Sequence, residues 1–351
     1  MARRDIVEKD NRMINLAYME CFASCVLTYL NFNGDDYRKV LLDYWNLNYQ
    51  FRTLLSSKDA RQIPLDLFYG IEMKFIKGDS KTLNQSVRGG SAAICFCQAS
   101  KLDYFPRENL GMESSGFQHS ILIYGWDQSG EKYVVGDPTV SAIVQMNPDE
   151  VLKAGAVKKG RDELHYFVLT KPSIPYSPPD IKSCIRKSAQ RNLYYYGNSD
   201  GEAVPLANET TPEERRRREW QQWFSNRKSG AKALEAFEAD FVQSAVWAPE
   251  ARVAWMKRNA ITIASIRRIR SAVWQAYIET GCIGENRLRE GKEQIDSISG
   301  LWNTISFKLL KALKEQDTAL SDQALSPLIA KLKQAEIRFM EWLILVAEEG
   351  D

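Results

Sequence analysis

The sequence predicts an α+β fold in which a domain of mixed helices and strands precedes an all-α helical domain. Three observations support this. An early apolar run, Asn15–Leu30, has helical spacing. Several short segments of strand character follow between residues 92 and 169, and after the proline-rich stretch Lys171–Asp180 the pattern is helical almost throughout. Because four prolines in ten residues exclude helix and central strand, the stretch separates two domains, 1–172 and 173–351.

The first predicted element is a helix over residues 14–30, where apolar residues recur at spacings of three and four. Asparagine and glutamate residues precede Cys21, which indicates a helix start near Met19–Cys21. A second helix is predicted over residues 35–44, and short strands are predicted near Phe68–Ile76.

Apolar segments bounded by turn residues then predict a set of strands. They cover residues 92–98, 119–126, 132–136, 142–146 and 166–169. Cys95 and Cys97 lie on the same face of the first of these strands, because side chains alternate with period two. Two thiols on a buried strand face are typical of core filling.

The second domain is predicted to consist of helices, each with helical periodicity and several with recognisable starts. Pro212 and Pro249 each stand near the beginning of one, where a missing N–H costs nothing. The predicted helices cover residues 180–194, 212–226, 230–245, 249–279, 285–315 and 323–348.

Composition limits the classes of function. The 47 basic and 45 acidic residues give a net charge of +2, which argues against bulk binding of nucleic acid. Six cysteines without a CxxC pair predict neither a disulfide framework nor a zinc site. The N-terminal segment lacks the apolar core of a signal peptide, and no run of 18 apolar residues predicts a membrane helix. We therefore expect a soluble, reduced, cytoplasmic protein without a metal or membrane partner.

Cys21 stands where a nucleophile is expected. At the N-terminus of a helix, unpaired N–H groups and the helix dipole favour thiolate over thiol. Thiolate is the nucleophilic form of cysteine. The structural alternative is that Cys21 is a small buried apolar residue, as free cysteines commonly are.

His119 and Asp137 are candidates for the base and for the group that orients it. His119 begins one predicted strand, and Asp137 ends the next, with a hairpin turn at 127–130 between them. An antiparallel register places these two ends side by side, so that Asp137 orients His119 and His119 accepts the proton of Cys21. The structural alternatives are a histidine with no chemical role and a turn aspartate before proline.

In this order the residues resemble the papain-like cysteine peptidase superfamily, and more closely the family of the N-terminal domain of butirosin biosynthesis protein H. The motifs that carry the resemblance are a cysteine opening the first helix, DYFP at 103–106, HSILIYGWD at 119–127 and VVGDP at 134–138. The similar region spans residues 10–170, and no motif of the helical half matches.

The resemblance implies a papain-like domain and roles for four residues. Cys21 is matched to the nucleophile, His119 to the general base and acid, and Asp137 to the orienting acid. Papain-like enzymes place a glutamine six residues before the cysteine as an oxyanion-hole donor, and here that position is Asn15. Asparagine carries the same amide on a shorter stem, and the Cys21 backbone N–H would be the second donor.

The resemblance also implies an activity. The expected enzyme takes an acyl group from a carrier-protein thioester and transfers it to an amine, forming an amide or releasing a chain in specialised-metabolite biosynthesis. Antibiotics of the nonribosomal peptide or polyketide kind are products of such chemistry. The implied partners are an acyl or peptidyl carrier protein and an amine acceptor. No cofactor of its own is implied, since phosphopantetheine is carried by the partner.

Two basic clusters lie in the helical half. Arg215, Arg216, Arg217 and Arg218 form the first, and Arg267, Arg268 and Arg270 form the second. Consecutive arginines cannot all face one way on a helix, so one interpretation is a solvated charged face. The other is a docking site for an acidic carrier protein, where Arg215–Arg218 bind the phosphate of phosphopantetheine.

Two other functions are compatible with the same residues. One is a cysteine peptidase or amidase that uses Cys21, His119 and Asp137 with water as the acceptor. The other is a catalytically silent papain-like scaffold that binds a partner through its helical half. The presence of all three side chains in one chain argues against the silent scaffold.

Overall fold

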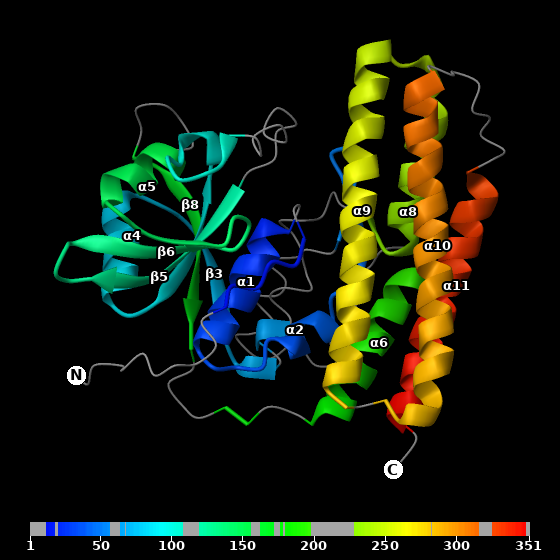
Figure 1. Ribbon diagram of the computed structural model, residues 1–351, viewed down its shortest axis with the longest axis horizontal. Coiled ribbons are helices and arrows are strands. Elements are labelled where there is room, and N and C mark those ends of the chain that lie inside the picture. The colour runs from blue at the N-terminus through cyan, green and yellow to red at the C-terminus, as the bar shows by residue number, and fades with distance from the viewer. Residues whose placement is uncertain are drawn as a thin grey trace, which may run out of the picture. The chain divides into compact units, whose positions relative to one another are not determined.

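The computed structural model describes residues 12–17, 20–56, 64–66, 68–107, 119–155, 162–171, 176–177, 180–197, 228–281, 283–315 and 325–348. The chain divides into two compact units (Figure 1). The first unit comprises Met1–Val40 and Arg61–Pro178, and the second comprises Leu41–Ala60 and Pro179–Asp351. The architecture is α+β, with antiparallel sheets and a helical C-terminal part.

The segment Leu41–Ala60 distinguishes these units from the domains expected from the sequence. The sequence pattern assigns it to the first domain, whereas in the structure it groups with the second unit. One reason is that Asn48 of β1 pairs with Ser229 of β9. Another is that the Trp45 ring stacks on Phe339, with ring centroids 4.6 Å apart. Pairing between such distant segments leaves no local sequence signal.

The first unit is built on a six-stranded sheet with the order β3-β8-β4-β5-β6-β7. All neighbouring strands run antiparallel. The strands are β3 (Glu72–Gly78), β4 (Ala92–Cys97), β5 (His119–Asp127), β6 (Lys132–Asp137), β7 (Ala142–Met146) and β8 (Leu164–Thr170). Each strand predicted between residues 92 and 169 is present, and its ends shift by no more than two residues.

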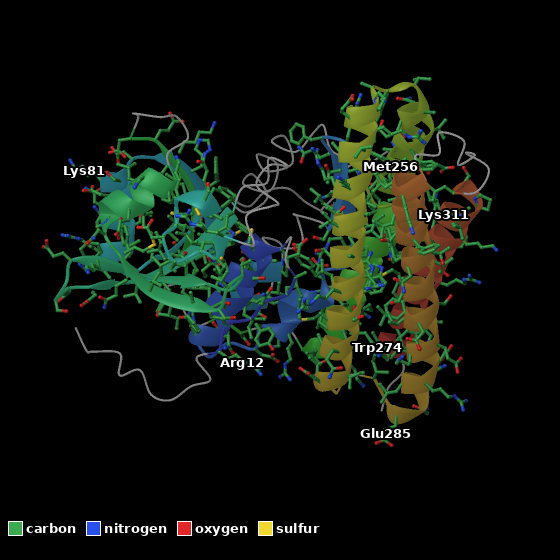
Figure 2. The ribbon with its side chains drawn as sticks, turned by 45° about the horizontal axis from the view of Figure 1, so that its top comes forward. Arg12, Lys81, Met256, Trp274, Glu285 and Lys311 are labelled. Carbon is green, nitrogen blue, oxygen red and sulfur yellow. The ribbon has the colours of Figure 1, made fainter. Side chains whose placement is uncertain are left out.

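Helices cover both faces of this sheet (Figure 1). On one face lie α4 (Ser80–Arg88) and α5 (Pro148–Gly155), and on the other lies α1 (Cys21–Phe32). Leu83 and Val87 of α4 enter the core against β4 and β5, while Lys81, labelled in Figure 2, is exposed. Neither α4 nor α5 was predicted, because both are short and α4 is largely polar.

Helix α1 begins at Cys21, which agrees with the predicted start near Met19–Cys21. The wider prediction of a helix over 14–30 is wrong at its N-terminal end, because residues 12–17 are not helical. The Ile14 N–H donates to Thr28 Oγ1 and the Leu16 N–H to Ser24 Oγ, each at 3.0 Å. These bonds hold the segment 12–17 alongside α1 instead of extending it.

Beyond α1 the chain forms a shorter helix than expected, α2 (Arg38–Leu42), where the sequence predicted 35–44. Asp36 accounts for the later start. Its side chain accepts a hydrogen bond from the Arg38 N–H, as acidic residues before a helix commonly do. Its carbonyl accepts a bond from the Tyr69 hydroxyl at 2.6 Å.

The second unit is mostly helical. Its elements are β1 (Leu47–Gln50), β2 (Thr53–Ser56), α6 (Ile181–Gly197), β9 (Lys228–Ser229), α8 (Ala231–Gln243), η3 (Ser244–Val246), α9 (Pro249–Glu279), α10 (Glu285–Glu315) and α11 (Ser326–Glu348). Helices α9 and α10 begin and end at the predicted residues. The helix expected over 212–226 lies outside the described residues. Helix α11 packs against α6, α8 and α10, and α10 also packs against α9.

The bundle core contains a buried ion pair as well as apolar side chains. Figure 2 labels Trp274 of α9, which is buried, and Lys311 of α10, which is exposed. Arg270 of α9 and Glu336 of α11 are both 0% exposed, and Arg270 Nη2 lies 3.0 Å from Glu336 Oε2. Trp302 Nε1 donates to Glu336 Oε1 at 3.0 Å. No helix in the described part of the chain has the length and apolar character needed to cross a membrane.

This buried pair predicts a large loss of stability when one partner is removed. Glu336→Leu leaves Arg270 charged and unpaired, which should lower the free energy of unfolding of the helical unit by about 3–5 kcal/mol. Replacing both, as Arg270→Met with Glu336→Leu, should restore most of that loss. Asp296→Ala is the matched control, because its pair with Lys292 is exposed. Urea unfolding followed by far-UV circular dichroism measures all four proteins, and a single variant as stable as the control would contradict the prediction.

Candidate active site

Cys21 is the first residue of α1, at the helix end where backbone N–H groups lack intrahelical partners. Its neighbour Phe22 fixes this end of the helix on the sheet. The Phe22 ring lies 5.8 Å from that of Phe96 on β4 and 5.0 Å from that of Phe167 on β8, measured between centroids. Cys21 is partly exposed, so a small molecule can reach a thiol held in a fixed place.

His119 and Asp137 meet where β5 begins and β6 ends. The two strands pair antiparallel, as the hairpin turn between them predicted. His119 Nε2 lies 2.8 Å from Asp137 Oδ2. His119 is 8% exposed and Asp137 is 0% exposed, so water does not compete for this bond.

Cys21 also acts on the His119 ring, because its side chain contributes to the raised pKa of the imidazole. Because Nε2 of the ring faces Asp137, Nδ1 is the nitrogen left for the sulfur. The structure therefore brings Cys21, His119 and Asp137 together in the order sulfur, imidazole, carboxylate. This is the arrangement of nucleophile, base and orienting group that cysteine-dependent acyl chemistry requires.

The charge state of His119 follows from its neighbours. Burial alone would lower the pKa of the ring, but the hydrogen bonds and negative charges of Asp137 and Cys21 outweigh burial and raise the pKa to about 10. The ring is therefore an imidazolium at neutral pH. A positive ring beside a cysteine sulfur favours the thiolate, so the pair can exist as thiolate and imidazolium.

Asp137 is held on both carboxylate oxygens. The Thr139 N–H donates to Oδ1 at 3.0 Å, and the Tyr104 hydroxyl donates to Oδ2 at 3.2 Å, the same oxygen that His119 approaches. These donors satisfy both oxygens of a fully buried carboxylate. Sequence reasoning did not single out Tyr104, although it lies in the DYFP segment that contributes to the resemblance.

Asn15, in the segment 12–17, contacts the turn that follows Asp137. Its side chain is exposed, and Nδ2 donates to the Thr139 carbonyl oxygen at 3.3 Å. The amide is therefore engaged with the backbone of the site. Its expected role as an oxyanion-hole donor stays a prediction.

The other thiols near the site are in a different environment. Cys25, one helical turn beyond Cys21, is 0% exposed, and its Sγ donates to the Ser120 carbonyl at 3.5 Å. Burial raises the pKa of Cys25 far above its ordinary value, and negative charge on Cys21 and Asp137 raises it further. Burial also raises the pKa of Cys95, and both Cys95 and Cys97 fill the sheet core as expected.

The predicted basic clusters have different outcomes. Arg215, Arg216, Arg217 and Arg218 lie outside the described residues. In the second cluster, Arg268 is exposed and Arg267 is half-buried, but Arg270 is fully buried with Glu336. Arg270 therefore does not belong to a surface cluster. Within the described residues, no group of three or more His, Cys, Asp or Glu side chains could hold a metal ion.

Comparison with known proteins adds no assignment. No protein-family model matches the chain, and no curated protein matches its sequence.

The environments of the thiols predict which cysteine reacts first. Iodoacetamide at neutral pH should alkylate Cys21 well before Cys25, Cys95 or Cys97, because only Cys21 combines access with a neighbouring imidazolium. Peptide mass mapping at short times measures the order, and Cys21→Ser should abolish the early adduct. Early modification of Cys25 would move the nucleophile to that residue.

The raised pKa of His119 predicts how stability depends on pH. The folded-state pKa of about 10 lies above the ordinary 6.5, so the folded chain binds this proton more tightly than the unfolded chain. The resulting stabilisation is fully present below pH 6.5 and is lost as pH rises towards 10. We expect the excess stability of wild type over Asp137→Asn to shrink across this range.

Urea unfolding at pH 6, 8 and 10 measures that difference, with buffers matched in ionic strength. His119→Gln is the control, because it has no imidazole to titrate. The difference in unfolding free energy between His119→Gln and Asp137→Asn should therefore not follow the pH course expected for wild type. A wild-type excess that stays constant or grows with pH would contradict the assignment of the proton to His119.

Proposed function

We propose that this chain is a cysteine-dependent acyltransferase, with a papain-like first unit, that moves an acyl group from a carrier-protein thioester to an amine. The observation that carries the proposal is the hydrogen bond between His119 and Asp137, together with Cys21 at the start of a helix, where its side chain raises the pKa of the His119 ring. A helix packed on an antiparallel sheet, with the cysteine on the helix and the histidine on a strand, supports the papain-like assignment.

In the first half-reaction the Cys21 thiolate attacks the thioester carbonyl carbon, and a carbon–sulfur bond forms. The tetrahedral intermediate collapses by breaking the bond to the carrier's sulfur. His119, protonated in the resting site, gives its proton to that leaving thiolate. The products are acyl-Cys21, the free carrier thiol and a neutral imidazole.

In the second half-reaction the acceptor amine attacks acyl-Cys21. His119, now neutral, takes a proton from the attacking nitrogen, and the bond to Cys21 breaks to release the amide. The thiolate and imidazolium are restored together. Asp137 orients the ring and stabilises the imidazolium whenever it forms.

The negative oxygen of each tetrahedral intermediate needs hydrogen-bond donors. The backbone N–H of Cys21, at the helix N-terminus, is one candidate. The Asn15 amide is the second, and it would exchange its bond to the Thr139 carbonyl for one to the substrate.

The partners belong to the same proposal. A carrier protein presents its acyl group on phosphopantetheine, and the amine comes from a second substrate in the biosynthesis of a specialised metabolite. Five cysteines in the described residues are free thiols, which fits a reducing compartment such as the cytoplasm.

Intact-protein mass spectrometry tests the proposal. Wild type mixed with an acyl N-acetylcysteamine thioester should gain the mass of one acyl group, and Cys21→Ala should gain none. Adding a primary amine should discharge the adduct and yield the amide faster than water yields the acid. Water-only discharge would assign the site to a hydrolase, and absence of any adduct with thioesters of varied length would contradict covalent catalysis.

A further inference from the structure

The segment between β4 and β5 brings two aromatic side chains to the candidate site. After η1 (Ala99–Lys101), the Phe105 N–H donates to the Leu102 carbonyl at 3.0 Å, which closes a tight turn. Leu102 and Phe105 are buried in the sheet core, at 3% and 6% exposure. Because the core anchors both ends of the turn, Tyr104 between them is held in a fixed place.

Tyr104 contacts the carboxylate of Asp137. Its hydroxyl donates to Asp137 Oδ2 at 3.2 Å, while His119 Nε2 lies 2.8 Å from the same oxygen. The Thr139 N–H donates to Oδ1. The backbone donor fixes one oxygen, and the hydroxyl fixes the other. These two bonds set the plane of the carboxylate independently of its bond to His119.

Phe105 contacts the imidazole. The two rings meet edge to face at 67°, with centroids 5.0 Å apart. This contact limits rotation of the His119 ring and covers it from water. Adjacent residues of one turn therefore touch the two partners of the same hydrogen bond.

We propose that Tyr104 is a positioning residue that orients Asp137 towards His119, with Phe105 as the wall against which the imidazole packs. The role rests on the proposed function, since it matters only if His119 serves Cys21. The Tyr104 hydroxyl donates to Asp137, so its effect on His119 passes through Asp137.

The chemistry of the hydroxyl suits this role. Burial, followed by the negative charge of Asp137, raises the pKa of Tyr104 above its ordinary value. Tyr104 therefore keeps its proton at any working pH and remains a donor to Asp137. The titratable groups around His119 and Tyr104 are Asp137, Cys21, Cys25 and Cys97.

Removing the hydroxyl should weaken the pairing of His119 without removing any charge. In Tyr104→Phe the carboxylate keeps the Thr139 bond but is free to turn about its own axis, so the imidazolium loses part of its partner. A hydrogen bond to a charged group of this kind contributes about one pKa unit. We expect the His119 pKa to fall by about that amount. Because the ring stays protonated at pH 7, Cys21 alkylation at that pH should stay close to wild type.

The chain offers a clean measurement, because it contains two histidines, His119 and His165. Carbon–proton NMR spectra of the ring positions, recorded from pH 5 to 11, follow both residues, and His165→Gln assigns the signals. Iodoacetamide kinetics report on Cys21 in the same samples. Tyr69→Phe is the matched control, because its hydroxyl donates to the Asp36 carbonyl elsewhere in the unit.

Phe105→Leu separates positioning from packing. It keeps all donors to Asp137, so its His119 pKa should stay closer to wild type than that of Tyr104→Phe. Equal shifts of the His119 pKa in the two variants, or a wild-type His119 pKa in Tyr104→Phe, would overturn the positioning role. A wild type whose His119 titrates at its ordinary pKa and whose Cys21 reacts like the buried thiols would instead overturn the proposed function.

Discussion

The fully buried carboxylate of Asp137 is the constraint around which the first unit arranges its candidate site. A charge without solvent is strongly unfavourable unless hydrogen bonds surround it. Here the donors come from three separate places: the turn after β6 supplies Thr139, the segment after β4 supplies Tyr104, and the start of β5 supplies His119. Because Tyr104 and His119 come from segments next to other strands, the carboxylate is fully satisfied only when β4, β5 and β6 are correctly paired. The hydrogen bonds that stabilise the buried carboxylate therefore form only when the sheet has its correct register.

The same requirement explains why two cysteines one helical turn apart differ so much. Cys21 lies at the exposed start of α1 next to an imidazolium, whereas Cys25 is fully buried and donates to a backbone carbonyl. Negative charge at Asp137 and Cys21 raises the pKa of Cys25 further, so the site that favours a thiolate at one position disfavours it at the next. Exposure and the interaction with His119 separate the two thiols.

Much of this could be predicted from sequence because it depends on neighbours along the chain. The hairpin joining β5 and β6 is local, so its turn and alternation placed His119 beside Asp137. Features that depend on distant segments were missed. The bonds from residues 12–17 to Ser24 and Thr28 shorten α1, and the pairing of β1 with β9 moves 41–60 into the second unit. Tyr104 was overlooked because a loop has no periodicity to show where its side chains lie.

Arg270 shows how local composition misleads when a charge is buried. Its sequence neighbours Arg267 and Arg268 suggest one solvated basic face, yet about half of the positions of α9 are buried, and Arg270 is one of them. Glu336 on α11 meets Arg270 there, and the Trp45 ring lies 4.1 Å below the guanidinium carbon. A buried pair of this kind adds little net stability but penalises any packing in which its partners separate. The helical unit thus uses a charge to fix which helices meet, as the first unit uses Asp137 to fix which strand ends meet.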